Sequence, residues 1–333
     1  MQAYTIRRYS STDKFQRAEI SKPRVNEHEV LVEIHASSIN PLDHKLKSGE
    51  FKVFLPYKFP LVLGHDFAGI VREVGSKVEN FKVGDAVFGR PSDFHIGTFA
   101  EYIAVNEADV ALKPSNLTFE EAASIPLVGL TAWQAFQEKA KLTKGQKVFI
   151  QAGSGGVGSI AIQLAKHLGA FVATTTSTEN VELVKRLGAD EIIDYKSQDF
   201  EKILRNYDVV LNSQNEQTLN ASMQILNPGG NVVSISGPPD PAFAKARHLP
   251  WFLKMAMYFL SKKVKSKAKQ LGVDYSFLFM HADGKQLAEI GKLIEAGIIH
   301  PVVDRVYDFA QLNEAMDYVA SGRVKGKVVI KIK

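Results

Sequence analysis

The chain has 333 residues, of which 45% are hydrophobic and 23% charged, and it carries a net charge of +5. This profile is typical of a soluble globular protein, and the length predicts two domains. Cysteine is absent, which excludes disulfides and any zinc site with thiolate ligands. The mild positive charge suits an anionic ligand such as a phosphorylated cofactor and does not by itself indicate nucleic acid. The first residues, MQAYTIRRYS, contain no apolar signal core, so we expect a cytoplasmic protein.

The N-terminal third has the pattern of short β-strands. Residues Glu29 to Ala36 alternate apolar and polar side chains, as a half-buried strand does. Further strands are predicted at Phe67–Val74, Asp85–Gly89 and Thr98–Val105, and glycine-containing turns separate them. Many short strands at close spacing predict a small barrel or sandwich.

A helix is predicted at Thr131–Lys141, and from Lys147 onward strands and helices alternate. This order predicts an α/β domain with a doubly wound parallel sheet. The tail returns to strand character on both sides of a helix at Gln311–Ser321. The predicted strands of the second half are Lys147–Gln151, Phe171–Thr175, Glu191–Asp194, Asp208–Asn212, Asn231–Ser236, Val302–Tyr307 and Lys327–Ile332.

A glycine-rich loop, Gly153-Ser154-Gly155-Gly156-Val157-Gly158, lies between a predicted strand and a predicted helix. In a dinucleotide-binding loop the first glycine permits the tight turn, the second lets the backbone approach the pyrophosphate, and the third lets helix and strand pack closely. The first amides of the helix then face the phosphates. The order strand, loop, helix and second strand favours dinucleotide binding over a simple glycine-rich turn.

The end of the second strand of this unit distinguishes the two nicotinamide cofactors. Enzymes that use NAD usually place an acid there to hold the ribose hydroxyls. Residues 174–178 are Thr-Thr-Thr-Ser-Thr, and the first acid is Glu179. Hydroxyls without a carboxylate accept a 2′-phosphate more readily, so the pattern favours NADP. The alternative is that these hydroxyls only cap the next helix.

Several segments spread along the chain carry a family resemblance: Asn40–Asp43, Gly64–Gly69, Val83–Val87, Gly97–Tyr102, Pro126–Trp133, the glycine loop and Gly326–Val329. Together they resemble the medium-chain dehydrogenase/reductase superfamily over essentially the whole chain, and within it the quinone oxidoreductase and alkenal (enone) reductase branch. The resemblance implies a GroES-like partial β-barrel catalytic domain at residues 1–126 and 283–333, a Rossmann domain at residues 127–282, and an active site between them.

Zinc enzymes of this superfamily bind the metal through Cys, His and Cys. Here Asn40 stands at the first position, His65 keeps the histidine, and residues 126–128 replace the second cysteine. One nitrogen ligand cannot hold zinc, so we expect a zinc-independent protein. The resemblance implies that Asn40 donates to substrate or nicotinamide and that Asp43 and His65 are catalytic cleft residues. The alternatives are a helix cap for Asp43 and a structural, hydrogen-bonded histidine for His65.

The resemblance also assigns cofactor contacts outside the glycine loop. It implies that Thr131 lies beside the nicotinamide and that Ser177 and Tyr195 contact the 2′-phosphate of NADPH. Asn180 stands where many relatives have lysine. Arg323 precedes the last strand, where relatives often place a cofactor contact, and the alternative for it is a solvated charge.

The implied function is NADPH-dependent transfer of hydride, without metal, to a quinone or an α,β-unsaturated carbonyl. Such acceptors need little Lewis-acid help, because hydrogen-bond donors can hold the developing enolate oxygen. The alternatives are a metal-free carbonyl or alcohol dehydrogenase, and a non-enzymatic NADPH-binding protein associated with RNA or membranes. No base-stacking motif accompanies the basic residues, so nucleic acid is not expected.

Two segments after the Rossmann strands remain. Residues 248–271 combine aromatic and basic side chains; we favour a roof over the substrate pocket, and a peripheral membrane helix is the alternative. Residues Tyr275 to Met280 predict a strand. An open edge there would invite uncontrolled pairing, and pairing with a second copy removes it. We therefore expect a homodimer, with Phe277 or Phe279 in a packed interface.

Overall fold

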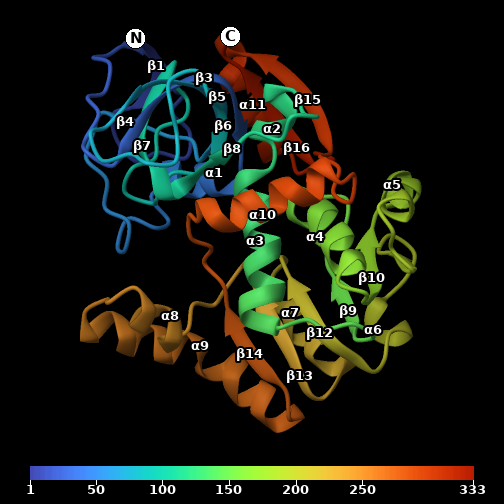
Figure 1. Ribbon diagram of the computed structural model, residues 1–333. Helices are drawn as coiled ribbons and strands as arrows, with labels where there is room; N and C mark the ends of the chain where they lie inside the picture. Colours follow the sequence, from blue (N-terminus) through green and yellow to red (C-terminus); the bar gives the residue numbers. More distant parts are fainter. The chain divides into compact units, whose positions relative to one another are not determined.

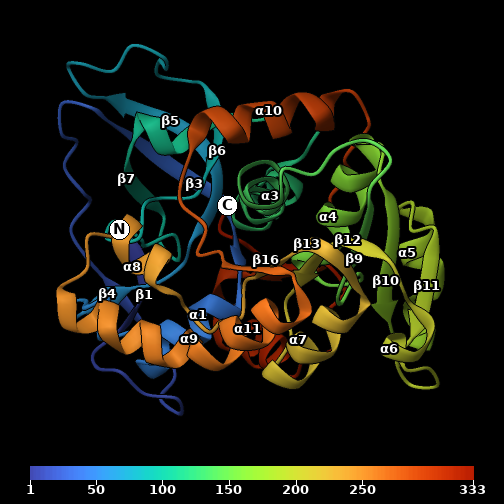
Figure 2. The ribbon, with the colours of Figure 1, turned by 90° about the horizontal axis from the view of Figure 1, so that it is seen from below.

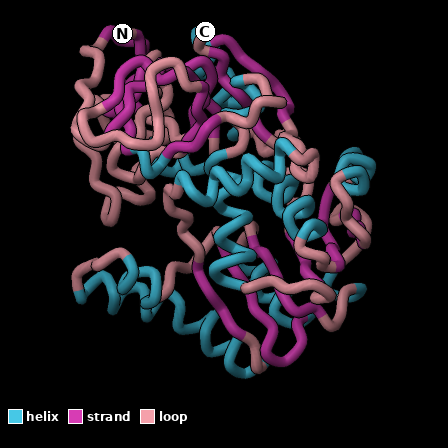
Figure 3. The backbone as a smooth tube through the Cα atoms, in the orientation of Figure 1, coloured by secondary structure: helices cyan, strands magenta, loops and turns pink.

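The computed structural model describes residues 1–333 and divides the chain into two compact units. Unit 1 contains Met1–Leu130 and His281–Lys333, and unit 2 contains Thr131–Met280. Both units combine strands and helices (Figures 1 and 3). The predicted fold class, a GroES-like partial barrel with a doubly wound parallel sheet, is confirmed.

Unit 1 is built around a seven-stranded sheet in which β3 is the central strand. Strand β3 pairs antiparallel with β5, β7 and β16, so the C-terminal strand completes a sheet that the N-terminal segment begins. A second sheet has the order β2-β1-β4. The elements of unit 1 are β1 Gln2–Ile6, β2 Gln16–Glu19, β3 Glu29–Ile39, α1 Pro41–Ser48, β4 Leu61–Val62, β5 Asp66–Val74, β6 Ala86–Gly89, β7 Tyr102–Asn106, β8 Val110–Leu112, α2 Phe119–Ala123, α10 Gly284–Glu295, β15 Val303–Asp308, α11 Leu312–Ala320 and β16 Lys327–Lys331.

The core of unit 1 lies inside the partial barrel. Alternate residues of β3, namely Val30, Val32 and Ile34, are fully buried and pack against Phe67 and Val87 of neighbouring strands. The intervening Leu31 and Glu33 are buried as well. The alternating sequence thus predicted the strand correctly, but the strand is buried on both faces and is not half-buried. Burial of these branched side chains supplies most of the driving force for closing the barrel.

Unit 2 is built on a six-stranded sheet with the order β11-β10-β9-β12-β13-β14, in which every pair is parallel. The strand order reverses between β9 and β12, and ligands of such sheets bind beyond the carboxyl ends of the strands at that reversal. The elements are β9 Lys147–Ile150, α4 Gly156–His167, β10 Phe171–Thr176, α5 Val181–Arg186, β11 Glu191–Asp194, α6 Phe200–Ile203, β12 Tyr207–Asn212, α7 Glu216–Ser222, β13 Leu226–Ser234, α8 Pro241–Ala246, α9 Trp251–Leu271 and β14 Asp274–Phe277.

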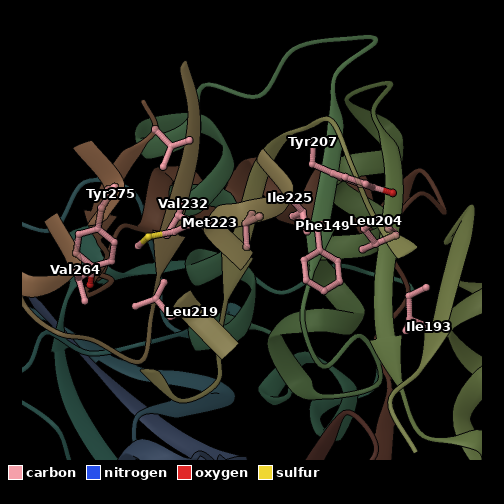
Figure 4. Packing of buried hydrophobic residues seen from close by; sticks show 14 residues of the cluster. Phe149, Ile193, Leu204, Tyr207, Leu219, Met223, Ile225, Val232, Val264 and Tyr275 are labelled. Atoms are coloured by element: carbon pink, nitrogen blue, oxygen red, sulfur yellow. The ribbon is translucent and has the colours of Figure 1, made fainter. Parts of the chain in front are cut away.

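One face of this sheet holds a large apolar cluster (Figure 4). Phe149 and Tyr207 pack there with their ring centroids 6.4 Å apart, and Val264 of α9 and Tyr275 of β14 belong to the same cluster. In Figure 2, α5 and α6 lie at the β11 end of the sheet, whereas α8 lies at the far end of the unit. The core therefore runs from the nucleotide-binding strands to the last strand and its preceding helix.

Several predicted elements differ from those observed; strand β13, for example, begins at Leu226 and not at Asn231. The helix predicted at Thr131–Lys141 begins earlier, as α3 at Pro126–Trp133, and continues as a π-helix at Gln134–Ala140. Proline suits the first helical turn because it lacks the N–H that would be unpaired there. The strand predicted at Thr98–Val105 begins later, as β7. Its pairing with β3 starts at Tyr102, opposite Glu33, because the preceding Ala100 instead forms a bridge with Ala3 of β1.

Strand β14 is shorter than the predicted Tyr275–Met280 segment. It pairs with β13 from Asp274 to Phe277 and ends there, because β13 itself ends at Ser234, the partner of Phe277. On its other side β14 has no partner strand in the chain, so it forms the edge of the sheet.

No helix in the structure is long and apolar enough to cross a membrane.

Candidate functional site: a dinucleotide loop and a buried polar cluster

The glycine loop connects β9 to α4, and each of its three key glycines has a different environment. A Cβ on Gly153 would lie 2.2 Å from Thr174 Oγ1, and one on Gly158 would lie 2.2 Å from the carbonyl oxygen of Ala152. A Cβ on Gly155 would meet only the Ala152 oxygen, at 3.3 Å. Gly153 and Gly158 are therefore required by packing within the loop, whereas the space beside Gly155 is open.

Gly155 is also the N-cap of α4, and no side chain caps the helix there. The first backbone N–H groups of a twelve-residue helix therefore point, uncapped, toward the open side of the loop. Uncapped amides and the helix dipole favour an anion at this position. The loop fits the pyrophosphate of a dinucleotide, as the sequence predicts.

Beside the loop, at the end of β10, hydroxyl and amide side chains form a compact polar cluster. The Thr176 hydroxyl donates to Ser154 Oγ at 3.1 Å, and Asn180 Nδ2 donates to Ser154 Oγ at 3.3 Å and to Ser177 Oγ at 3.1 Å. Asn180 Oδ1 is buried and has no hydrogen-bond partner. A buried acceptor without a partner is costly; an amide flip would place a donor at that position instead. The members of the cluster are hydroxyls and an amide. The nearby Glu179 carboxylate interacts with Ser177 but is paired with Lys196, so the cluster fits a 2′-phosphate.

The nearest charges around this cluster belong to the turn that follows it and to the next strand. Glu179 forms an ion pair with Lys196, with Oε1 2.6 Å from Nζ. The hydrogen bond from Lys196 is the main cause that lowers the pKa of Glu179 to about 2. The backbone N–H of Tyr195 donates to Thr176 O at 3.1 Å, and the Tyr195 side chain is exposed. The backbone at Tyr195 and Lys196 thus lies directly beside the end of β10.

In unit 1, the three predicted catalytic residues lie together at the start of α1. Asn40 is the N-cap of α1, and its backbone N–H donates to Asp43 Oδ2 at 2.8 Å. The other carboxylate oxygen of Asp43 lies 2.7 Å from Nδ1 of His65, and both side chains are essentially inaccessible to solvent. Asp43 therefore caps the helix and also orients the imidazole, leaving Nε2 without a partner in the chain.

A buried salt bridge supports the Asn40 side chain from behind. Asn40 Nδ2 donates to Asp66 Oδ2 at 2.8 Å, and Asn40 Oδ1 accepts a hydrogen bond from Lys327 Nζ. Lys327 Nζ lies 3.2 Å from Asp66 Oδ2, and Ser38 Oγ donates to the same oxygen at 2.8 Å. Removing one partner of a buried pair leaves an uncompensated charge, so this network fixes the orientation of the Asn40 amide.

The donor set of this cluster does not fit a catalytic zinc ion. No group of three or more histidine, cysteine or acidic side chains is placed to hold a metal. Asp43 is already engaged with the helix N-terminus and His65, and Asp66 is engaged with Lys327 and Asn40. Zinc in enzymes of this kind takes three protein ligands and an open position, which these residues do not offer.

The predicted site residues fall into two groups. Asn40, Asp43 and His65 form one cluster in unit 1, whereas the glycine loop, Ser177 and Tyr195 lie around the end of β10 in unit 2. Thr131 is buried in α3, and Arg323 is exposed in the turn before β16.

The sequence prediction did not single out the salt-bridge residues Asp66 and Lys327 or the supporting Ser38. The local signal for the first two was limited: Asp66 and Lys327 each begin a strand, β5 and β16, and are followed directly by apolar residues. Buried charges of opposite sign are expected to pair.

Comparison with known proteins agrees with both units. Residues 26–115 match the family described as alcohol dehydrogenase GroES-like domain, and residues 187–330 match zinc-binding dehydrogenase. The chain is 35% identical to 2-methylene-furan-3-one reductase of Solanum lycopersicum, covering 99% of this chain and 79% of that protein. It is 32% identical to NADPH-dependent alkenal/one oxidoreductase of Arabidopsis thaliana, covering 99% and 79%.

Among solved structures, the quinone oxidoreductase from Coxiella burnetii superposes with a TM-score of 0.87 at 30% identity, covering 100% of this chain and 99% of that one. The agreement extends over both units and includes relatives on the reductase side of the family. The chain therefore belongs to the medium-chain dehydrogenase/reductase superfamily, in its quinone oxidoreductase and enone reductase branch.

Proposed function

We propose that the protein is an NADPH-dependent oxidoreductase that reduces a quinone or an α,β-unsaturated carbonyl compound. The observation that carries the proposal is the polar cluster at the end of β10, which offers hydroxyls and an amide beside an open dinucleotide loop, while the nearby carboxylate of Glu179 is paired with Lys196. The names of the relatives support it, since they include an NADPH-dependent alkenal/one oxidoreductase and a 2-methylene-furan-3-one reductase.

NADPH, when bound, would supply the hydride, and one proton completes the reduction: it is added to the α-carbon of the enolate formed from an enone, or to the oxygen of the quinolate formed from a quinone. The backbone at Gly155 and the first turn of α4 would hold the pyrophosphate. Ser177, Asn180 and Tyr195 would hold the 2′-phosphate. Thr131 beside the nicotinamide and Arg323 as a further cofactor contact rest on the family assignment.

The cluster in unit 1 would serve the acceptor. Asn40 Nδ2 has two hydrogens. One is donated in a hydrogen bond to Asp66, so the second can be donated to a carbonyl oxygen of the acceptor. His65 has its Nδ1 held by Asp43, so its Nε2 can orient the acceptor or carry a proton to it. Hydrogen-bond donors held in place stabilise the negative oxygen that develops during hydride transfer.

Product analysis tests this assignment. NADPH consumption is measured with quinones, with alkenals or enones, and with simple saturated aldehydes, and NADH is run in parallel. We expect turnover with the first two classes, a saturated carbonyl as the product from enones, and a preference for NADPH. Turnover confined to saturated aldehydes, giving alcohols, would favour a carbonyl reductase instead.

We also propose a homodimer formed through the free edge of β14. Strand β14 is a four-residue strand at the end of a parallel sheet and has no partner on its outer side. Its unpaired backbone groups would invite uncontrolled pairing with other chains, so we expect this edge to be covered. Pairing with β14 of a second copy would continue the sheet across a two-fold axis.

A further inference from the structure

Helix α9 has a narrow buried stripe that starts only in its second turn. Its buried side chains are Met257, Ser261, Val264 and Ala268, and none of residues 251–256 is buried. Figure 1 shows α8 and the first half of α9 reaching beyond the edge of the six-stranded sheet past β14. The C-terminal half of α9 therefore packs on unit 2, whereas its N-terminal half projects.

The projecting half is unusually apolar for an exposed surface. Trp251, Phe252, Met255 and Phe259 recur at the spacing of one helix face, opposite the buried stripe. Trp251 is 76% exposed and Phe259 is 62% exposed. Large aromatic side chains gathered on one exposed face mark an interaction surface rather than scattered surface apolar residues.

The base of this projection is fixed to the sheet. Phe243 of α8 packs edge to face on Phe277 of β14, with ring centroids 5.3 Å apart, and the Tyr275 hydroxyl donates to Pro238 O at 2.6 Å. Arg247 lies over the Phe279 ring at 4.9 Å. The aromatic face is thus presented on an anchored helix.

The charge of the helix has one sign. Residues 251–271 contain six lysines and no acid. Lys263 pairs with Glu216 and Lys265 with Asp240. The remaining lysines have no acidic partner in the chain; they are Lys254, Lys262, Lys267 and Lys269. Lys254 and Lys262 each lie three residues from a member of the aromatic face, Trp251 and Phe259, so unpaired positive charge borders that face.

We propose that the N-terminal half of α9 is a membrane-contact surface that binds the face of an anionic lipid bilayer. Tryptophan, phenylalanine and methionine on one helix face enter the boundary between headgroups and acyl chains, and lysines beside them pair with anionic headgroups. A protein partner would need matching acids, whereas an anionic bilayer satisfies the apolar face and the lysines together. The proposal does not depend on the reductase activity. It requires that this face stays open when a second copy pairs at the β14 edge, which the test below examines.

The test uses the whole protein with NADPH bound. Sedimentation with vesicles is compared for phosphatidylcholine alone and for a mixture of phosphatidylcholine and phosphatidylserine. We expect binding to the mixed vesicles and a shift of Trp251 emission to shorter wavelength. The double variant W251S/F259S is expected to lose about tenfold in partitioning through lost apolar burial. The control I203S, which removes an exposed apolar side chain from α6 in the same unit, is expected to bind like the unmodified protein.

A second pair of changes tests the charges. K254E/K262E reverses the two exposed lysines beside the aromatic face that have no acidic partner, and we expect it to abolish the preference for anionic vesicles. NADPH binding serves as the check that each variant is folded. Equal binding to both kinds of vesicle, or full binding by both double variants, would overturn the proposal. It would also be overturned if W251S/F259S turned a dimer into a monomer while no protein bound vesicles, because a second copy would then cover this face.

Discussion

The different environments of Gly155 and Gly158 allow cofactor binding to be separated from folding by two matched substitutions. Gly158→Ala places a Cβ 2.2 Å from a backbone oxygen and 2.7 Å from Gly153 Cα. Neither is a flexible side chain, so the loop itself must move. Overpacking of this kind costs about 1–3 kcal/mol, against a gain of about 1 kcal/mol for alanine within a helix.

We therefore expect Gly158→Ala to be destabilised by up to about 2 kcal/mol, and for a unit of this size each kcal/mol lowers Tm by about 2–4 °C. Gly155→Ala should behave differently. The backbone of Gly155, with φ −80° and ψ 175°, suits alanine, and its Cβ has only one neighbour, at 3.3 Å. The weaker N-cap and the smaller entropy of the unfolded chain oppose each other, so stability should stay within about 0.5 kcal/mol.

For NADPH binding the order should be reversed: Gly155→Ala should weaken it, although this substitution hardly changes stability. The new methyl group would occupy the space through which a pyrophosphate approaches the backbone. We expect Gly155→Ala to raise the Kd for NADPH about tenfold or more, equivalent to about 1.4 kcal/mol. Thermal unfolding without cofactor and a fluorescence titration with NADPH measure the two effects. Unchanged NADPH affinity in Gly155→Ala, together with unchanged Tm in Gly158→Ala, would refute the reasoning.

Three further predictions concern other parts of the chain. Tyr195→Phe should weaken NADPH binding about fivefold, the value of one hydrogen bond, and leave NADH binding unchanged; parallel titrations would show an equal loss for both if the role is only structural. Burial raises the pKa of Glu33, but hydrogen bonds from Lys333, Arg72 and Tyr102 outweigh it and lower the pKa to about 2 from 4.5. Its stabilising effect is present above pH 4.5 and is lost as the pH falls toward 2, so acid unfolding of Glu33→Gln should be less steep over that range, and identical curves would contradict this. Light scattering should give twice the mass of one chain, and Phe277→Asp should yield monomers or aggregates; a monomer at micromolar concentration would argue against pairing at β14.

The two halves of the candidate site were not equally visible in the sequence. The glycine loop could be predicted because its function is local: three glycines, a strand and a helix follow one another within residues 147–167. The hydroxyl run at residues 174–178 was visible for the same reason. The sequence could not show that Ser154 of the loop and Asn180 of the following helix meet across the end of β10.

The cluster around Asn40 depends on distant parts of the chain. Asp66 and Lys327 are separated by most of the sequence, and only the pairing of β3 with both β5 and β16 brings them together. Periodicity predicts each strand but not its neighbours, so this buried pair was outside what local patterns can predict. The π-helix after α3 was missed as well, because its residues have ordinary helix-forming composition.

The discontinuous composition of unit 1 has a consequence for how the chain is made. During synthesis the whole of unit 2, residues 131–280, leaves the ribosome before β15 and β16 exist. Unit 2 can therefore fold as a continuous segment. Until β16 is synthesised, the edge of β3 that pairs with it remains unpaired. Until then the carboxylate of Asp66 lacks the ammonium group of Lys327, which is synthesised after the whole of unit 2. We therefore expect the Asn40 cluster to become ordered only after unit 2 has been made and β16 has joined β3.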